Sequence, residues 1–510
     1  MLPLALLLIL LTNLLPLSSL AAISDSSSSY HSFLKCMQKH SPKNVSNEIY
    51  SQSNTSYTSV LRAYIRNARF NTSSTKKPLL IVTATSDSHV SATVICTKTL
   101  GLRLKTRSGG HDYAGLSYVC DVPFVILDMF RQRSIEVDAA DRSAWVQAGA
   151  TLGELYYSIW KSSNLLGFPA GICPTVGAGG HISGGGYGNM LRKHGLASDH
   201  VVDAKIVDAK GNILDRKSMG EDTFWAIRGG GGASFGVVLS YKWQNAAPTT
   251  DDGLFMRMLL QPSSSTVKES SITVKSTIVA LYLGNAEELV SILEKDFPLL
   301  GLKKENCTEL SWMGSVLWWN NVQNGTSPDV LLNRKPNSAV SGVRKSDYVQ
   351  KPISKSGLES LWMKMIELGK IGLVFNPYGG RMSEIPASET PFPHRAGNLF
   401  KIQYSVSWSD SGAEAERDCV TKIRSLFSFM TPYVSENPRS AYLNYRDLDI
   451  GINHFGKNSY EEGKVYGVKY FNDNFDRLVK VKTAVDPENF FKNEQSIPIL
   501  PSKVFRKILA

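Results

Sequence analysis

Short apolar runs rich in β-branched and aromatic residues recur along residues 79–245, separated by polar segments and glycines. Runs of this length and composition predict strands, and the helical period of Thr151–Ser162 predicts a helix among them. The expected strands are Leu79–Thr83, Leu102–Thr106, Phe124–Met129, Ala144–Ala148, Val201–Val207 and Val237–Tyr241.

A second pattern begins near Pro248, with longer helical segments between the strands. Its expected strands are Leu254–Leu260, Ile278–Leu283 and Leu399–Trp408, and its expected helices are Glu287–Phe297, Leu358–Leu368 and Ala413–Met430. This mixture predicts an α+β layer, an antiparallel sheet with helices on one side. After Asp449 the pattern predicts one more helix, Lys469–Lys482.

The first 22 residues, Met1–Ala22, form a leucine-rich apolar stretch followed by small residues. No Lys or Arg precedes Lys35, so the basic region that usually begins a signal peptide is missing. The apolar stretch is interrupted at Thr12-Asn13 and is short for a membrane span. We interpret it as a secretory signal peptide. Five glycosylation sequons agree with export and begin at Asn44, Asn54, Asn71, Asn306 and Asn324.

Composition narrows the class of protein. The 510 residues are 42% hydrophobic, which suits two or three domains and excludes a mostly disordered chain. The net charge of +11 indicates either a solvated basic surface or attraction to an anionic matrix or acidic substrate. Without a dense Lys/Arg run, and with export expected, we predict no nucleic-acid partner.

Several common functional motifs are missing. The glycine-rich segments do not satisfy G-x-G-x-x-G, no P-loop is present, and neither C-x-x-C nor H-E-x-x-H occurs. A Rossmann dinucleotide site and a zinc site are therefore not expected. The segment Gly232–Gly236 fits G-x-S-x-G, but a helical pattern precedes it and a strand pattern follows, the reverse of a nucleophile elbow.

Two glycine-rich segments are the candidate ligand-binding loops. Arg107–Tyr113 reads RSGGHDY, and consecutive glycine amides in such a turn can bind an anion. Gly167–Gly188 holds nine glycines in 22 residues and includes Cys173 and His181. In an exported chain an unpaired thiol is unusual, so Cys173 is expected to be either disulfide-bonded or bonded to something else.

Seven segments, in this order, resemble the berberine bridge enzyme-like family of plant FAD-linked oxidases. They are RSGGHDYAGLSY, GICPTVGAGGHISGGGYG, DTFWAIRGGGGASFGVV, KSDYV, FPHRAGNLFKIQY, AYLNYRDLDIG and VDPENFFKNEQSIP. The resemblance implies an α+β fold: a PCMH-type FAD-binding domain over 30–248 and an antiparallel-sheet substrate domain with covering helices over 249–448. A C-terminal segment, 449–505, is expected to return to the FAD domain.

The resemblance also implies an FAD bound covalently twice, through His111 to the flavin 8α carbon and through Cys173 to flavin C6. Other residues matched to cofactor binding are Arg107, Ser108, Gly109, Gly110, Val176, Gly177, His181, Gly185, Tyr187 and Asn474. Cys36 and Cys96 match the family disulfide. Cys307 and Cys419 are left as buried thiols or a further pair, and Cys120 has no assigned role.

Five residues match positions of the family's substrate pocket: Tyr113, Tyr187, Lys401, Gln403 and Tyr445. Lys401 and Gln403 are two residues apart on an expected strand and therefore share a face. The family assigns Tyr445 as catalytic base. Because a tyrosine pKa near 10 is high for a base at neutral pH, we expect the Lys401 ammonium to lower it.

The implied reaction moves a substrate O–H proton to Tyr445 and a carbon hydride to flavin N5, after which dioxygen is reduced to hydrogen peroxide. Val176 matches the position that controls oxygen access, and its small side chain favours an oxidase. Alkaloid- and cannabinoid-forming relatives have glutamate where Gln403 stands. Some members place a basic side chain near the stretch matching Gly284–Val290, where this chain has Glu287 and Glu288, expected to be solvated.

The leading interpretation is a secreted oxidase of the extracellular space or cell wall, acting on an oligosaccharide or a monolignol-type alcohol. The vacuole and secretory lumen are further possible compartments. The first alternative is an oxidase or oxidative cyclase of specialised metabolism, and the second is a flavoprotein without turnover. We expect no later membrane span and a monomer.

Overall fold

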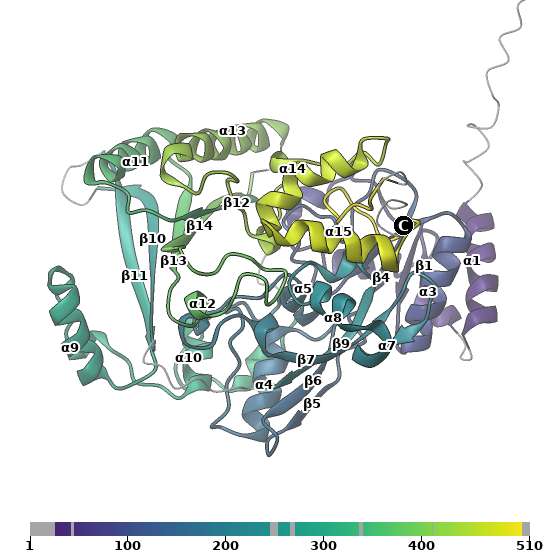
Figure 1. The fold of residues 1–510 in the computed structure, drawn as a ribbon, viewed down its shortest axis with the longest axis horizontal. Helices are drawn as coiled ribbons and strands as arrows, with labels where there is room; N and C mark the ends of the chain where they lie inside the picture. The colour runs from purple at the N-terminus through teal and green to yellow at the C-terminus, as the bar shows by residue number, and fades with distance from the viewer. Residues whose placement is uncertain are drawn as a thin grey trace, which may run out of the picture.

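The computed structural model describes residues 26–41, 45–244, 253–265, 271–335, 340–410 and 412–501. Met1–Ala22, Asn44 and the expected domain boundary at residue 248 lie outside these ranges. Within them the chain is an α+β protein with three sheets (Figure 1). None of its described helices is both long and apolar enough to cross a bilayer.

The first sheet has the strand order β1-β2-β4-β3, with β2, β4 and β3 parallel. Its strands are β1 (Ile49–Ser51), β2 (Leu80–Thr83), β3 (Arg103–Arg107) and β4 (Phe124–Asp128), and its helices are α1 (Ser26–His40), α2 (Tyr57–Arg62) and α3 (Asp87–Thr99). Every residue of β2 and β4 is buried, as expected for parallel strands covered on both faces. β3 ends at Arg107, where the predicted ligand-binding loop Arg107–Tyr113 begins.

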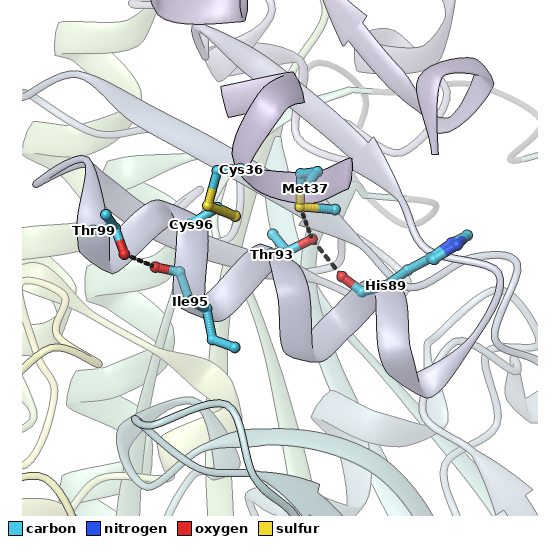
Figure 2. The surroundings of a disulfide bond; sticks show 7 residues. All are labelled: Cys36, Met37, His89, Thr93, Ile95, Cys96 and Thr99. Atoms are coloured by element: carbon cyan, nitrogen blue, oxygen red, sulfur yellow. Dashed lines mark hydrogen bonds between the residues drawn. A yellow bond between two sulfur atoms is a disulfide. The ribbon is translucent and has the colours of Figure 1, made fainter. Parts of the chain in front are cut away.

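Two helices of this region are joined covalently, as Figure 2 shows. Cys36 of α1 and Cys96 of α3 form a disulfide, as the family resemblance implied. Beside it the Thr93 hydroxyl lies 2.7 Å from the His89 carbonyl oxygen and 3.8 Å from Met37 Sδ. Cys120 and Cys419 are buried free thiols and Cys307 is a half-buried one, so no further pair forms.

The second sheet is antiparallel, with the order β5-β6-β9-β7-β8. Its strands are β5 (Ile135–Asp138), β6 (Ser143–Gln147), β7 (Val201–Val207), β8 (Ile213–Leu214) and β9 (Val237–Gln244). The accompanying helices are α4 (Leu152–Ser162), α5 (Ala178–Ser183), α6 (Leu191–His194), α7 (Arg216–Met219) and α8 (Glu221–Ile227). Since α8 precedes Ser234 and β9 follows it, the helix–strand order expected around Gly232–Gly236 is confirmed.

The third sheet is antiparallel, with the order β11-β10-β13-β14-β12. Its strands are β10 (Leu254–Ser264), β11 (Ile272–Tyr282), β12 (Ser341–Val349), β13 (Gly372–Pro377) and β14 (Phe400–Trp408). Helices α9 (Ala286–Asp296), α10 (Trp312–Trp319) and α12 (Arg381–Glu384) lie in its connections, while α11 (Lys355–Leu368) and α13 (Ala413–Phe429) pack on the sheet (Figure 1).

The C-terminal helices lie against the second-sheet region (yellow in Figure 1). The sequence predicts one helix over Lys469–Lys482, and this prediction is wrong: α14 (Ser459–Phe471) ends and α15 (Asn474–Val485) begins within that range. Asn472 causes the break because its φ of 44° is left-handed. On α15, Arg477 pairs with Asp222 at 2.7 Å and buried Lys482 donates to the Ser234 carbonyl oxygen at 2.7 Å.

Candidate active site

A cavity of about 460 Å³ is lined by residues of all three sheets. Twelve of the predicted site residues line it: Ser108, Gly109, Gly110, His111, Tyr113, Cys173, Val176, Gly177, His181, Tyr187, Gln403 and Tyr445. Segments far apart in the sequence therefore meet at one site.

Two glycine loops form the backbone wall of the cavity, and they cross without room for side chains. A Cβ atom on Gly109 or Gly177 would overlap the backbone of the opposite loop, and one on Gly177 would also overlap Ser108 Oγ. The Ser108 hydroxyl fixes the crossing by donating to the Ala148 carbonyl oxygen at 2.5 Å. Gly180 also lines the cavity, and no heavy atom lies within 4 Å of a Cβ built there. This wall therefore presents backbone atoms to a ligand, as a closely bound cofactor requires.

His111 and Cys173 converge on one hydroxyl group. His111 Nε2 lies 2.9 Å from Thr175 Oγ1, and Cys173 Sγ lies 3.6 Å from the same oxygen. Burial, assisted by the Arg66 guanidinium, lowers the pKa of His111 to about 4, so its imidazole is neutral at neutral pH. The Cys173 thiol is exposed to the cavity. A neutral imidazole and an accessible thiol are the two nucleophiles that a doubly attached flavin needs.

His181 is a half-buried residue of the same wall. Its Nε2 accepts the Gly171 amide at 3.1 Å, and its carbonyl oxygen accepts the Asn444 side-chain amide at 3.0 Å. Burial and the charge of Lys401 lower its pKa to about 4. The His181 ring thus holds the glycine loop at Gly171, and its backbone carbonyl oxygen binds the segment that carries Tyr445.

Four tyrosines form the side-chain wall of the cavity: Tyr113, Tyr187, Tyr442 and Tyr445. The hydroxyl groups of Tyr187 and Tyr445 form a hydrogen bond. The ring centroids of Tyr442 and Tyr445 lie 5.1 Å apart in an edge-to-face arrangement. Tyr442 also accepts the Gly186 amide at 3.1 Å on its hydroxyl, which links the two walls.

Lys401 lies fully buried behind these rings on β14. Its Nζ is 3.2 Å from the Tyr187 ring centroid, 4.1 Å from that of Tyr442 and 4.6 Å from that of Tyr445. No described residue gives this Nζ a hydrogen bond. The ammonium is therefore held by the faces of aromatic rings, a cation–π arrangement that is strongest away from water.

The expectation that Lys401 lowers the pKa of Tyr445 is not met. Burial raises the pKa of Tyr445 well above 10, the neighbouring Tyr187 and Tyr113 add to this, and the Arg257 guanidinium opposes it. Burial likewise lowers the pKa of Lys401. The physical reason is that both groups leave water without an opposite charge at hydrogen-bonding distance, which favours the neutral form of each.

Gln403 and Tyr113 form a polar pair on the substrate side. Gln403 Nε2 donates to the Tyr113 hydroxyl at 3.2 Å. Arg344 of β12 lies with its Cζ 5.8 Å from the Tyr113 ring centroid and donates to the Val406 carbonyl oxygen at 2.6 Å. A second cavity, of about 380 Å³, shares His111, Tyr113 and Cys173 and adds the guanidinium groups of Arg66 and Arg344.

Sequence reasoning missed Arg257, which lines the main cavity from β10. Its Nε donates to Asn376 Oδ1 at 2.9 Å, and its Cζ lies 5.4 Å from the Trp319 ring centroid. Glu287 and Glu288 are exposed, and Glu287 pairs with Lys304, as expected for solvated helix charges. Tyr442 and Thr175 were also missed. Both lie inside segments that resemble the family, and that position was the available signal.

Three residues matched to cofactor binding do not line this cavity. Arg107 is fully buried and binds Asp128 Oδ2 through Nε at 3.0 Å and Nη2 at 2.5 Å. Asn474 donates to the Ala387 carbonyl oxygen at 2.7 Å, and Gly185 turns the chain with a φ of 105°. In the structure Arg107 and Asn474 bind other protein groups, and the match of all three residues to cofactor binding stays a prediction.

Comparison with known proteins agrees with this geometry. A family model described as FAD binding domain matches residues 78–216, and one described as Berberine and berberine like matches residues 441–498. Berberine bridge enzyme-like 21 of Arabidopsis thaliana is 58% identical to this chain, covering 96% of each. The chain belongs to the berberine bridge enzyme-like family. The α+β fold and the FAD-binding domain expected from the sequence agree with this family.

Solved structures extend the family assignment. Berberine bridge enzyme-like 28 from Arabidopsis thaliana superposes with a TM-score of 0.85 at 43% identity, covering 92% of this chain and all of that one. Phl p 4, a grass pollen allergen with glucose dehydrogenase activity, superposes with a TM-score of 0.86 at 40% identity, covering 92% of this chain and 99% of that one. The protein is therefore an FAD-linked oxidoreductase of α+β fold.

Proposed function

We propose that the protein is a secreted oxidase with bicovalently bound FAD that oxidises an alcohol or hemiacetal carbon of a carbohydrate and reduces dioxygen to hydrogen peroxide. The observation that carries the proposal is the convergence of His111 and Cys173 on Thr175, in the same cavity as the Tyr187–Tyr445 pair. One part of the site has the nucleophiles for cofactor attachment, and another has the groups for proton transfer.

In this proposal the crossed glycine loops bind FAD, and His111 and Cys173 are its points of covalent attachment. When bound, FAD would supply the two-electron acceptor for a hydride from the substrate carbon, with dioxygen as the final electron acceptor. We assign residues 30–248 and the returning segment 449–505 to the FAD domain, and 249–448 to the substrate domain. The contacts of α15 with Asp222 and Ser234 support this division.

Tyr445 removes the substrate O–H proton, and Tyr187 shares that proton through the hydrogen bond between the two hydroxyl groups. Because its pKa is raised, Tyr445 is mostly neutral at neutral pH, and its basic form becomes more abundant as pH rises. The Arg257 guanidinium, which lines the same cavity, favours the Tyr445 phenolate, and Lys401 Nζ lies 4.6 Å from the centre of the Tyr445 ring. Gln403 and Tyr113 orient the substrate hydroxyl, which lowers the entropic part of the barrier.

A carbohydrate is the preferred substrate class because a neighbour at 40% identity is a glucose dehydrogenase. The main cavity of this protein has a polar lining of tyrosine, glutamine and arginine, which suits the hydroxyl groups of a sugar. The second cavity gives room for a further sugar unit. A monolignol-type alcohol is the other candidate within the same chemistry, and activity on a phenolic, terpenoid or alkaloid would place the enzyme in specialised metabolism.

Dioxygen as acceptor is supported by Val176, which lines the cavity. Among the Phl p 4 structures the wild-type protein is a glucose dehydrogenase, whereas an isoleucine-to-valine variant is a glucose oxidase. A valine at the family's oxygen-access position therefore favours the oxidase.

Export is supported by the disulfide and by the sequons. Disulfides form in oxidising compartments. Asn54, Asn71, Asn306 and Asn324 are exposed in the structure, so each is accessible to glycosylation. We place the mature protein in the extracellular space or cell wall.

A peroxide assay with cellobiose, D-glucose, oligogalacturonides and coniferyl alcohol tests the function. Hydrogen peroxide with a sugar and none with coniferyl alcohol is the expected result. Peroxide with coniferyl alcohol alone would assign the monolignol class, and no peroxide with any of the four would contradict the proposed oxidase. Tyr466→Phe, a buried tyrosine outside the cavity lining, serves as the control variant.

A further inference from the structure

Tyr445 does not lie on a strand or a long helix. It ends a single 3₁₀ turn, Leu443–Tyr445, whose position depends on contacts made by the residues around it. On its N-terminal side the Tyr442 amide donates to Ser346 Oγ at 2.9 Å, and the Asn444 side chain donates to the His181 carbonyl oxygen. The contacts on its C-terminal side are ionic.

The ionic contacts come from Lys345, the residue next to Ser346 on β12. Its Nζ lies 3.0 and 2.8 Å from the two carboxylate oxygens of Asp447 and 2.6 Å from Asp449 Oδ2. The side chains of Lys345 and Asp447 are 1% and 7% exposed, so the pair is buried. Arg424 of α13 closes the cluster with two donors to Asp449, at 2.8 and 2.5 Å.

Neighbouring residues of β12 thus hold the segment on both sides of Tyr445. Side chains of consecutive residues on a strand point to opposite faces, so Ser346 and Lys345 reach the segment from two directions. The amide of Asp447 also donates to the Tyr470 hydroxyl at 3.1 Å, and its carbonyl oxygen accepts Gln495 Nε2 at 2.7 Å. The turn that carries Tyr445 is therefore clamped at Tyr442 and at Asp447.

We propose that Lys345, Asp447 and Ser346 are positioning residues that hold Tyr445 at the distance from the substrate that proton transfer requires. The proposal rests on the proposed role of Tyr445 as base. Removing one partner of a buried ion pair leaves an uncompensated charge, which drives the surrounding segment to rearrange. A displacement of about 1 Å in a catalytic group lowers a rate about a hundredfold, so the clamp controls the rate although it lies outside the cavity.

Two variants of the FAD-loaded protein test the clamp. Lys345→Met removes the ammonium and keeps the length of the side chain, while Ser346→Ala removes one hydroxyl at little risk to folding. We expect flavin reduction by cellobiose or D-glucose under anaerobic conditions to slow about a hundredfold in Lys345→Met and about tenfold in Ser346→Ala. KM should change little because Gln403, Tyr113 and Arg257 are untouched.

Hydrogen–deuterium exchange measures the position of the segment without a substrate. Peptides covering residues 441–450 should exchange about tenfold faster in both variants than in the wild type, because local opening becomes easier. Asp199→Asn is the matched control, since the Arg395–Asp199 pair has the same side-chain exposures of 1% and 7%. It should lower stability while leaving exchange at 441–450 and the rate of flavin reduction unchanged.

The possible results distinguish a failure of the proposed clamp from a failure of the proposed function. Wild-type exchange at 441–450 in both Lys345→Met and Ser346→Ala would overturn the clamp, as would equal acceleration in Asp199→Asn. Slow reduction in Tyr445→Phe with normal reduction in both clamp variants would also overturn it and leave the proposed base standing. Normal reduction in Tyr445→Phe would instead remove the base itself, and with it the purpose of the clamp.

Discussion

The two walls of the cavity are built in different ways. The wall that includes Gly109 and Gly177 is backbone, contributed by two continuous glycine-rich segments that cross without space for side chains. The other wall consists of side chains from β10, β14 and the segment around Tyr445, together with Tyr113 and Tyr187 of the glycine-rich segments. A wall of crossing backbones accepts almost no substitution, whereas a wall of side chains can change one residue at a time. The comparison predicts that substitutions in the glycine segments act mainly on FAD binding and folding, whereas substitutions in the side-chain wall act mainly on the reaction.

The largest effect is expected on the side-chain wall. Tyr445→Phe removes the proposed base and should slow flavin reduction about a hundredfold to ten-thousandfold, the usual contribution of general base catalysis. The flavin absorption spectrum should stay unchanged because Tyr445 is not a point of attachment. Anaerobic stopped-flow mixing measures the rate, with Tyr466→Phe as control. A rate within threefold of wild type would refute the assignment.

Arg107 sharpens the comparison. Its motif predicts contact with the cofactor, whereas in the structure its guanidinium pairs with the buried Asp128 carboxylate. Arg107→Met leaves Asp128 buried and unpaired, which should cost about 3–5 kcal/mol of unfolding free energy. Urea denaturation measures this cost. The double variant Arg107→Met/Asp128→Asn should recover part of it. Loss of FAD without loss of stability would show instead that Arg107 acts on the cofactor.

Gly177→Ala tests how strictly the backbone wall excludes side chains. The added methyl group overlaps Ser108 Oγ and the Gly109 backbone, so we expect a loss of about 1–3 kcal/mol together with poor FAD incorporation. The ratio of flavin to protein absorbance reports incorporation. Gly180→Ala, where no atom lies within 4 Å of the new Cβ, is the matched control for folding. Full FAD loading in Gly177→Ala would mean that the crossing is loose.

The last expected effect is a pH dependence. Because the pKa of Tyr445 is raised above 10, its deprotonated fraction grows about tenfold for each pH unit below that value. The reductive rate at low substrate concentration should therefore rise from pH 6 to pH 9. Tyr445→Phe should remove this dependence. A profile that is already flat above pH 7 would indicate a base whose pKa is lowered, as the sequence alone had suggested.

The contrast between the walls also explains what the sequence could predict. Contiguous motifs identified His111, Cys173 and the glycine loops, and regular patterns identified most strands of the three sheets. Arg257 escaped because strand pairing, rather than sequence proximity, brings it beside Asn376 and the cavity. The pKa of Tyr445 escaped because it depends on burial among other tyrosines, and the division of Lys469–Lys482 into two helices depends on the backbone at Asn472.

Peptide mapping of the protein from its native source tests the central claim most directly. After tryptic digestion, the peptides that contain His111 and Cys173 should appear as one cross-linked species joined by a single flavin. Separate peptides with unmodified His111 and Cys173 side chains would contradict the account.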